Sequence, residues 1–230
     1  MKIIHLSDPH IHTKILHGID PVNRFKEALN HIIKNHLDAN LFIITGDLTH
    51  FGDEESYYRL NEILTKSALP KNLYPKLMIG NHDNRENIKK IFSNIPTDEN
   101  GFIQYFIEID DKRFIFLDTN LPGTDQGHLC KKRQGWLIDN LENNNESKKI
   151  YLFMHHNPLP LADKNSDEIG LQQREDFKNI IVANKDLIKH IFFGHQHITA
   201  SGNYLGINFS SPRSTWCPLV SNFSSNYRLG

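Results

Sequence analysis

The chain has few cysteines, no long apolar run and almost no net charge. Its 230 residues include two cysteines, Cys130 and Cys217, which are too few for a disulfide framework or a thiolate metal cage and fit a reducing compartment. No segment approaches the length of a membrane span, and the N-terminal run lacks the apolar core of a signal peptide. A formal net charge of −1 gives no electrostatic reason to expect nucleic acid or a membrane as partner. The sequence therefore favours a cytoplasmic protein.

The remaining composition is that of an ordinary globular protein, apart from its histidines. Hydrophobic residues make up 38% of the chain and charged residues 23%, as in most soluble domains. The length and the lack of any repeat or linker predict a single domain over residues 1–230, with a short tail after about residue 200. The 14 histidines are unusual. A polar surface alone would explain this number of histidines. Their positions in the sequence are therefore the evidence for or against a functional role.

Short apolar runs alternate with segments of helical spacing. Strands are expected over residues 2–6, 41–45, 76–79, 150–154 and 190–193, with a hairpin from 102–109 to 113–117. Helices are expected after Asp20, after Asp53, over 84–92, around Trp136 and Leu141, and over 171–183. Several of the strands are apolar on both faces. This alternation predicts an α/β domain whose sheet is covered by helices on each side.

Polar residues follow five of the expected strands, where the ligands of α/β sheets collect. The segments are Asp8-Pro9-His10, Gly46-Asp47, Gly80-Asn81-His82-Asp83, His155-His156 and Gly194-His195-Gln196-His197. Each one alone is weak evidence, because an Asp-x-His triplet arises by chance and a Gly-Asp pair is more often a turn. Together they place carboxylate, imidazole and carboxamide groups at the strand ends.

This set of donors predicts a site for two metal ions. Oxygen and nitrogen ligands without thiolates suit Mn, Fe, Zn or Co and do not suit a structural zinc finger. Two divalent ions, Asp8, Asp47 and a bridging hydroxide leave a net charge of about +1, which attracts an anionic phosphate. The neutral side chain of Asn81 preserves that surplus. Two ions about 3.5–4 Å apart also lower the pKa of a shared water and clamp the attacking and leaving oxygens.

The ordered set D-x-H, G-D, G-N-H-D, H and G-H-x-H resembles the calcineurin-like metallophosphoesterase superfamily over residues 3 to about 198. Segments 153–160 (FMHHNPLP) and 194–197 (GHQH) are most similar to class III cyclic-nucleotide phosphodiesterases and bacterial glycerophosphodiesterases. The resemblance implies a four-layer αββα sandwich of two mixed sheets. It also implies the metal ligands: Asp8, His10 and His197 for one ion, Asn81, His155 and His195 for the other, and Asp47 as the bridge.

The resemblance gives His82 a catalytic role. This residue corresponds to the family histidine that faces the substrate phosphate, where it stabilises developing charge or protonates the leaving oxygen. Asp83 either orients or charges that imidazole, or is the N-cap of the following helix. The implied reaction is in-line attack of a metal-bridging hydroxide on phosphorus, with an alcohol leaving and no phosphoenzyme.

Several further residues near these segments have two interpretations each. The family pattern favours His155 over His156 as the ligand, which leaves His156 as an alternative ligand or as a hydrogen-bond partner. His50 stands where close relatives commonly have Asp or Asn, so it either touches substrate or caps a turn. The others line the site or are merely solvated or packed: His12, His17, His128, Tyr204, Arg213 and Trp216.

The sequence favours a small phosphodiester as substrate, either a cyclic nucleotide or a glycerophosphodiester. The segment GDLTHFG (46–52) lacks the arginine expected by similarity to protein Ser/Thr phosphatases, and His82 differs from the arginine of lipid-A-pathway pyrophosphatases. Near the motifs the sequence has no Lys/Arg cluster with interleaved aromatics, so it does not indicate the basic groove of a nuclease. A phosphomonoesterase, a nuclease and a catalytically degenerate metal-binding scaffold are the alternatives. By resemblance, the glycerophosphodiesterases have a longer C-terminal region that caps the site and builds oligomers. Only a short tail follows His197 here, so a reduced cap is expected, and a homo-oligomer stays an open expectation.

Overall fold

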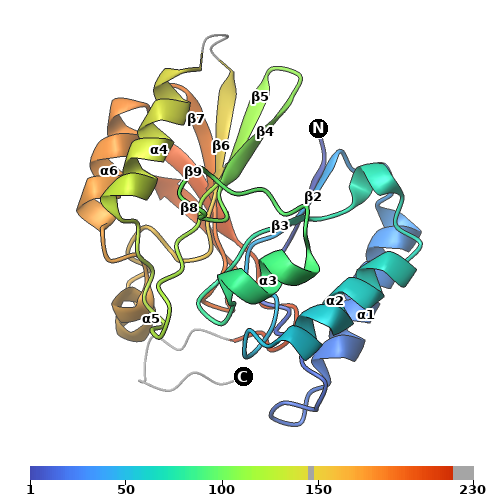
Figure 1. Cartoon of the computed structure of the whole chain (residues 1–230). Coiled ribbons are helices and arrows are strands. Elements are labelled where there is room, and N and C mark those ends of the chain that lie inside the picture. Colours follow the sequence, from blue (N-terminus) through green and yellow to red (C-terminus); the bar gives the residue numbers. More distant parts are fainter. Residues whose placement is uncertain (145–147, 220–230) are drawn as a thin grey trace.

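The helices and sheets of the protein form four layers (Figure 1). A computed structural model describes residues 1–144 and 148–219; the rest of the domain expected over 1–230, including the end of its tail, lies outside the described residues. Helices from the second half of the chain, yellow to orange, cover one sheet, and blue to green helices from the first half cover the other. The two sheets face each other in the middle of the molecule.

The first half of the chain builds a three-stranded sheet in the order β1-β2-β3, with both strand pairs parallel. Its strands are β1 (Ile3–Leu6), β2 (Leu41–Ile44) and β3 (Lys76–Leu77). Its helices are α1 (Pro21–Asn35), α2 (Glu54–Lys66), the 3-10 turn η1 (Lys71–Leu73) and α3 (Arg85–Ile91). Because parallel neighbours run in one direction, the carboxyl ends of these strands share one edge.

The second half builds a six-stranded mixed sheet in the order β4-β5-β6-β7-β9-β8. Its strands are β4 (Tyr105–Ile109), β5 (Lys112–Phe116), β6 (Lys149–Phe153), β7 (Ile188–Phe192), β8 (Ala200–Tyr204) and β9 (Ile207–Ser211). Its helices are α4 (Lys131–Glu142), α5 (Lys164–Ile169) and α6 (Arg174–Ala183). The pairs β5–β6, β6–β7 and β7–β9 are parallel, and the two outer pairs are antiparallel.

Three apolar clusters separate the four layers. In the fully buried strand β2, Phe42 and Ile44 pack toward α1 and α2, whereas Leu41 and Ile43 pack between the sheets. Successive side chains of a strand point to opposite faces, so a strand covered on both sides must be apolar throughout. Phe153 of β6 lies in the same inner cluster and stacks on Phe192 with ring centroids 4.4 Å apart.

The starts of the helices follow the local sequence closely. The Asp20 carboxylate accepts from the Asn23 amide at the start of α1, with Pro21 in the first turn, and Asp53 accepts from the Ser56 amide at the start of α2. Asn84 is the N-cap of α3. The interpretation of Asp83 as that cap is therefore wrong.

The expected αββα sandwich is confirmed, with three differences in detail. The three-stranded sheet is parallel throughout its described strands rather than mixed. Helix α5, a single polar turn and a half capped by Asp163, was not expected, and α6 begins at Arg174 rather than at residue 171. The short β-like pieces expected in the tail around residues 204–210 are two full strands, β8 and β9, which continue the large sheet. Within residues 1–144 and 148–219, no helix combines the length and apolarity that crossing a bilayer requires.

Candidate metal centre

The seven residues expected to hold metal ions come together at one end of the two sheets. Asp8, His10, Asp47 and Asn81 follow β1, β2 and β3 of the small sheet, and His155, His195 and His197 follow β6 and β7 of the large one. Hydrogen bonds link the strand ends of the two sheets here: the His195 amide donates to the Asp8 carboxylate at 3.1–3.2 Å, and the His155 ring donates to the Thr45 carbonyl oxygen at 2.7 Å. The site therefore lies across the interface between the two sheets.

The first group of donors consists of Asp8, His10, Asp47 and His197, whose nearest ligand atoms all lie within 4.8 Å of one another. The Nε2 atoms of His10 and His197 are 3.1 Å apart. His10 Nε2 is 3.4 Å from Asp47 Oδ2, and His197 Nε2 is 3.6 Å from Asp8 Oδ1. Three of these residues are almost completely buried, so water does not satisfy their lone pairs.

The second group surrounds His155. Its Nε2 atom lies 3.1 Å from Asn81 Oδ1 and 3.3 Å from Asp47 Oδ1, and the ring of His195 is 4.9 Å away between centroids. Asp47 therefore directs one carboxylate oxygen toward each group, Oδ2 toward His10 and Oδ1 toward His155. This is the geometry that the bridging role of Asp47 requires.

The hydrogen bonds of the imidazoles fit metal binding. His155 Nδ1 donates to the Thr45 carbonyl oxygen at 2.7 Å, and His197 Nδ1 donates to the Cys217 carbonyl oxygen at 2.9 Å. A carbonyl only accepts, so in the neutral rings both Nε2 atoms carry lone pairs aimed into the site. His195 uses its Nε2 to donate to the Ile169 carbonyl oxygen at 3.2 Å, so in the neutral ring the lone pair is on Nδ1. Such fixed tautomers are the usual support of metal-binding histidines.

The electrostatics of the site show the same preference for cations. Burial opposes ionisation of Asp8 and Asp47, but the neighbouring imidazoles outweigh it and hold both carboxyl pKa values below their ordinary range. Burial alone would lower the pKa of His155, yet Asp47 raises it to about 9. The pKa of His10 falls to about 3, mainly because of burial. Protons on His155 thus balance the carboxylates, and a metal ion would replace them.

Backbone strain is concentrated in this site. Five of the seven residues have left-handed φ angles: Asp8 (54°), His10 (45°), Asp47 (47°), His195 (68°) and His197 (57°). Side chains other than glycine rarely adopt this region and pay free energy for it. Packing is also tight here, since a Cβ on Gly80 would collide with the Asp47 carboxylate and one on Gly194 would collide with the Ser7 hydroxyl. The glycines of the G-N-H-D and G-H-x-H segments are therefore required by the approach of the loops.

His82 lies beside the first group and faces it. Its amide donates to Asp47 Oδ1 at 3.0 Å, and its Nδ1 donates to the His50 carbonyl oxygen at 2.7 Å. The ring is 4.7 Å from that of His10 and stacks on that of His50 at 5.1 Å. The Nε2 atom of His82 has no hydrogen-bond partner among the described residues that would hold it away from the site.

Asp83 holds the loops of the small sheet together. Its carboxylate accepts from the amides of Leu48, Thr49 and Gly80 and from the Tyr57 hydroxyl, at 2.8–3.1 Å. Burial, reinforced by Asp47, raises its pKa to about 6. None of these bonds goes to the imidazole of His82, which is anchored by His50 instead. Asp83 thus fixes the backbone of the loop that carries His82, and its hydrogen bonds do not support the interpretation in which its carboxylate contacts that ring.

His156 is fully buried next to the second group. Its Nδ1 is 2.8 Å from the Thr119 hydroxyl, and it shares a potential metal-binding group with His155 and His195. Only His155 also approaches Asn81 and Asp47 at hydrogen-bond distance. The geometry therefore favours His155 as the ligand and His156 as a neighbour packed behind it.

The C-terminal segment covers the first group, which agrees with one of the two interpretations of Trp216. Trp216 is 7% exposed and lies 5.0 Å from the His10 ring and 5.4 Å from the His50 ring. The Ser214 hydroxyl donates to the Asp8 carbonyl oxygen at 2.8 Å. Arg213 is exposed, and Tyr204 packs against the outer cluster of the large sheet. Trp216 thus forms a wall of the site, whereas the contacts of Tyr204 are those of core packing.

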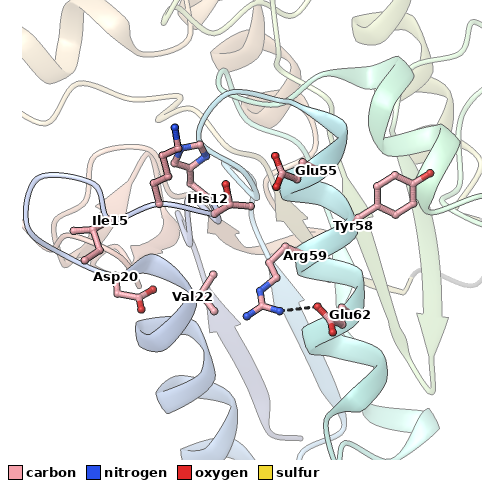
Figure 2. Close-up of a pocket in the computed structure, with 10 residues that line it drawn as sticks. His12, Ile15, Asp20, Val22, Glu55, Tyr58, Arg59 and Glu62 are labelled. Atoms are coloured by element: carbon pink, nitrogen blue, oxygen red, sulfur yellow. Dashed lines mark hydrogen bonds and ion pairs between the residues drawn. The ribbon is translucent and has the colours of Figure 1, made fainter.

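A separate cleft of about 620 Å³ lies between the loop before α1 and helix α2 (Figure 2). His12, Lys14, Glu55, Tyr58 and Arg59 are among its lining residues, and the Arg59 guanidinium pairs with Glu62 at 2.6 Å. None of the seven expected ligands lines it. Among the described residues, His12, His17 and His128 belong to no potential metal-binding group.

A donor set of carboxylates and imidazoles, shared across two half-sites at strand ends, is typical of metal-dependent hydrolases. Comparison with known families agrees: the model of the calcineurin-like phosphoesterases matches residues 1–199. The chain therefore belongs to the calcineurin-like phosphoesterase family, as its motifs indicated.

Two relatives show which members of the family are similar in sequence. A probable cyclic nucleotide phosphodiesterase of Rhodopseudomonas palustris is 32% identical over 93% of this chain and 77% of its own length. A probable glycerophosphodiester phosphodiesterase of Arcobacter nitrofigilis is 31% identical over 86% of this chain and 72% of its own length.

Solved structures show the same fold at low sequence identity. A dimetal phosphatase from Danio rerio superposes with a TM-score of 0.73 at 12% identity, covering 93% of this chain and 87% of the other. Purple acid phosphatase from yellow lupin seeds gives a TM-score of 0.67 at 11% identity, covering 93% of this chain and 44% of its own. These structures support the sandwich assignment.

Proposed function

We propose that the protein is a phosphodiesterase that uses two metal ions to hydrolyse a small phosphodiester. One observation carries this proposal: Asp47 directs one oxygen toward His10 and the other toward His155, so a single carboxylate serves both donor groups. We assign Asp8, His10 and His197 to one ion and Asn81, His155 and His195 to the other. The names of the solved dimetal and purple acid phosphatases with this fold support a pair of ions.

The proposed ions are Fe, Mn, Zn or Co, which match the nitrogen and oxygen donors. When bound, two such ions lower the pKa of a shared water and offset the charge of the phosphate. The protein contributes the geometry. His82 presents its Nε2 edge next to the first group, where its imidazolium form can donate a hydrogen bond or a proton to the leaving oxygen of the substrate; the neutral ring, with its proton on Nδ1, would only accept there. Its Nδ1 bond to the His50 carbonyl oxygen keeps that edge in place.

A diester is the proposed substrate because both relatives named above are described as phosphodiesterases, one of cyclic nucleotides and one of glycerophosphodiesters. The two unpaired cysteines, Cys130 and Cys217, support a reducing compartment and so the cytoplasm as the place of action.

A panel of esters tests this function. Protein freed of metal and reloaded with Mn²⁺ should hydrolyse bis-p-nitrophenyl phosphate faster than p-nitrophenyl phosphate, and cyclic AMP and glycerophosphoethanolamine then separate the two diester classes. Preference for the monoester would show a phosphomonoesterase instead.

The matched variant for this panel is His82→Ala. It should keep both ions and lose about 10²–10⁴-fold in kcat, the usual contribution of a positioned acid–base group. No turnover by the native protein with Mn, Fe, Zn or Co would contradict the enzyme proposal and leave a metal-binding scaffold.

A further inference from the structure

One ligand histidine differs from the others in the partner of its second ring nitrogen. His155, His197 and His195 each donate to a main-chain carbonyl oxygen, which fixes the tautomer because a carbonyl cannot donate. His10 instead has its Nδ1 atom 3.2 Å from Nδ1 of His50. An imidazole nitrogen can accept or donate, so the tautomer of His10 depends on that of His50.

We propose that His50 is a positioning residue for both parts of the site. Its ring accepts a hydrogen bond from His10 Nδ1–H, which leaves the Nε2 lone pair of His10 for a metal ion, and its backbone carbonyl accepts from His82 Nδ1–H. The ligand and the substrate-facing histidine are thereby tied to one residue. This inference rests on the proposed two-metal function.

The backbone around His50 makes this dual contact possible. A parallel bridge joins Ile11 to Thr49, and the His50 amide donates to the Ile11 carbonyl oxygen at 3.2 Å. On the other side, Asp83 accepts from the Thr49 amide at 3.1 Å. The segment that carries His50 is therefore fixed against both the His10 loop and the loop of His82.

The surroundings of the pair are aromatic, and the His82 ring completes the cluster, with its centroid 4.7 Å from that of His10 and 5.1 Å from that of His50. Trp216 lies 5.4 Å from the His50 ring and 5.0 Å from the His10 ring, and Phe51 meets the His50 ring edge at 4.5 Å. His10 is 2% exposed. Since solvent does not reach the Nδ1 atom of His10, loss of the His50 ring would leave a buried donor without an acceptor, which is costly.

Titration of metal-free protein with Mn²⁺ by calorimetry tests the proposal. His50→Leu removes the acceptor and keeps the carbonyl, so one of the two ions should bind about 10–100-fold more weakly, as is usual when the partner of a ligand histidine is lost. The other ion should bind nearly as in the native protein. His50→Asn offers a new side-chain oxygen and should recover most of the lost affinity.

His12→Leu is the matched control. His12 lies two residues beyond His10, and its ring meets Phe51 rather than a ligand. It should bind both ions with native affinity. Two results would overturn the proposal. One is native affinity for both ions in His50→Leu. The other is that both ions bind more weakly, and to the same extent, in His50→Leu and in His50→Asn.

Turnover separates positioning from substrate contact. The substrate is bis-p-nitrophenyl phosphate. If His50 positions the ligands, His50→Leu should lose activity at low Mn²⁺ and regain it at saturating Mn²⁺. Activity that stays low with both ions bound would show that His50 contacts the substrate, and would overturn the proposal. Because Mn²⁺ affinity is measured without substrate, failure of the native protein to hydrolyse any ester would refute the proposed function and leave the test of His50 intact.

Discussion

At the scale of single residues, the site depends on which groups each side chain contacts. Asp47 is the clearest case, because its two oxygens face two different imidazoles and its position also fixes the His82 amide. A ligand in such a position cannot be replaced by a neutral group without changing both half-sites. Asn81, in contrast, has its amide oxygen 3.1 Å from His155 Nε2 in the second group, and its amide nitrogen donates to Asp125.

This difference predicts the behaviour of two variants. Asp47→Asn should weaken the binding of both metal ions, because it removes the one charge that both share, whereas Asn81→Ala should weaken only one of them. Metal content after dialysis against a series of Mn²⁺ concentrations measures this. Two ions held with native affinity by Asp47→Asn would show that the carboxylate does not bridge.

His5 gives a prediction about pH. Its half-buried ring lies edge-on to Phe192 and bonds the Thr45 hydroxyl at 2.9 Å. Burial lowers its pKa from 6.5 to about 3, with Asp8 opposing and His190 of β7 adding to the shift. The unfolded chain takes up this proton first, so the free energy of unfolding should decrease as pH falls from 6.5 toward 3, by at most about 1.4 kcal/mol per pH unit for one group.

The variant His5→Gln removes this titration. Its stability relative to the native protein should improve steadily as pH falls through that range, as measured by urea unfolding of metal-free protein. Parallel pH curves for the two proteins would show that His5 is not the titrating group.

At the scale of elements, helix α2 and the site loops are joined through one buried contact. The Tyr57 hydroxyl donates to Asp83 at 2.8 Å and accepts from the Asn84 amide at 2.9 Å. Asp83 in turn holds the amides of Leu48 and Thr49. The helix therefore positions the loop that leads to His50, without any side chain of α2 reaching the metal ligands.

Tyr57→Phe should accordingly destabilise the protein by about 1–3 kcal/mol, because it leaves buried groups without a partner while hardly changing the volume. Chemical denaturation of the metal-free protein measures the loss. Tyr58→Phe, on the exposed face of the same helix, is the control and should lie within about 0.5 kcal/mol of the native protein. Equal stability of the two variants would remove Tyr57 from this account.

At the scale of the whole molecule, the site exists only because two sheets meet. Phe153 packs between them against Phe116 and Phe192, and His155 follows two residues later. Phe153→Ala should cost about 3–5 kcal/mol of stability and should also weaken Mn²⁺ binding, because His155, His195 and His197 all come from the large sheet. Val182→Ala, on the exposed side of α6, is the control for both measurements. Unchanged Mn²⁺ affinity in a folded Phe153→Ala protein would contradict this coupling.

Much of this arrangement could be predicted from the sequence, for physical reasons. Strand β2 is apolar at every position because both of its faces are covered. Asp20 and Asp53 mark the starts of α1 and α2 because an N-cap acts through hydrogen bonds that are local in the sequence. The expected ligands could be found because parallel strands end at one edge and present their polar residues there.

Other features could not be predicted, because they depend on contacts distant in sequence. The carbonyl oxygens of Thr45, Ile169 and Cys217 fix three histidine tautomers, yet every residue carries a carbonyl and no sequence signal marks these. The pairing of His50 with His10 follows from the bridge between Ile11 and Thr49, which is a tertiary register. Helix α5 is too short and polar for an apolar period to reveal.

The most direct test of the account is to count bound Mn²⁺ while following hydrolysis of bis-p-nitrophenyl phosphate by initially metal-free protein. Since Asp47 joins two donor groups, the activity should stay low while the first ion binds and should rise in proportion to the second. Full activity with a single ion bound, or two bound ions without hydrolysis, would contradict a two-metal phosphodiesterase.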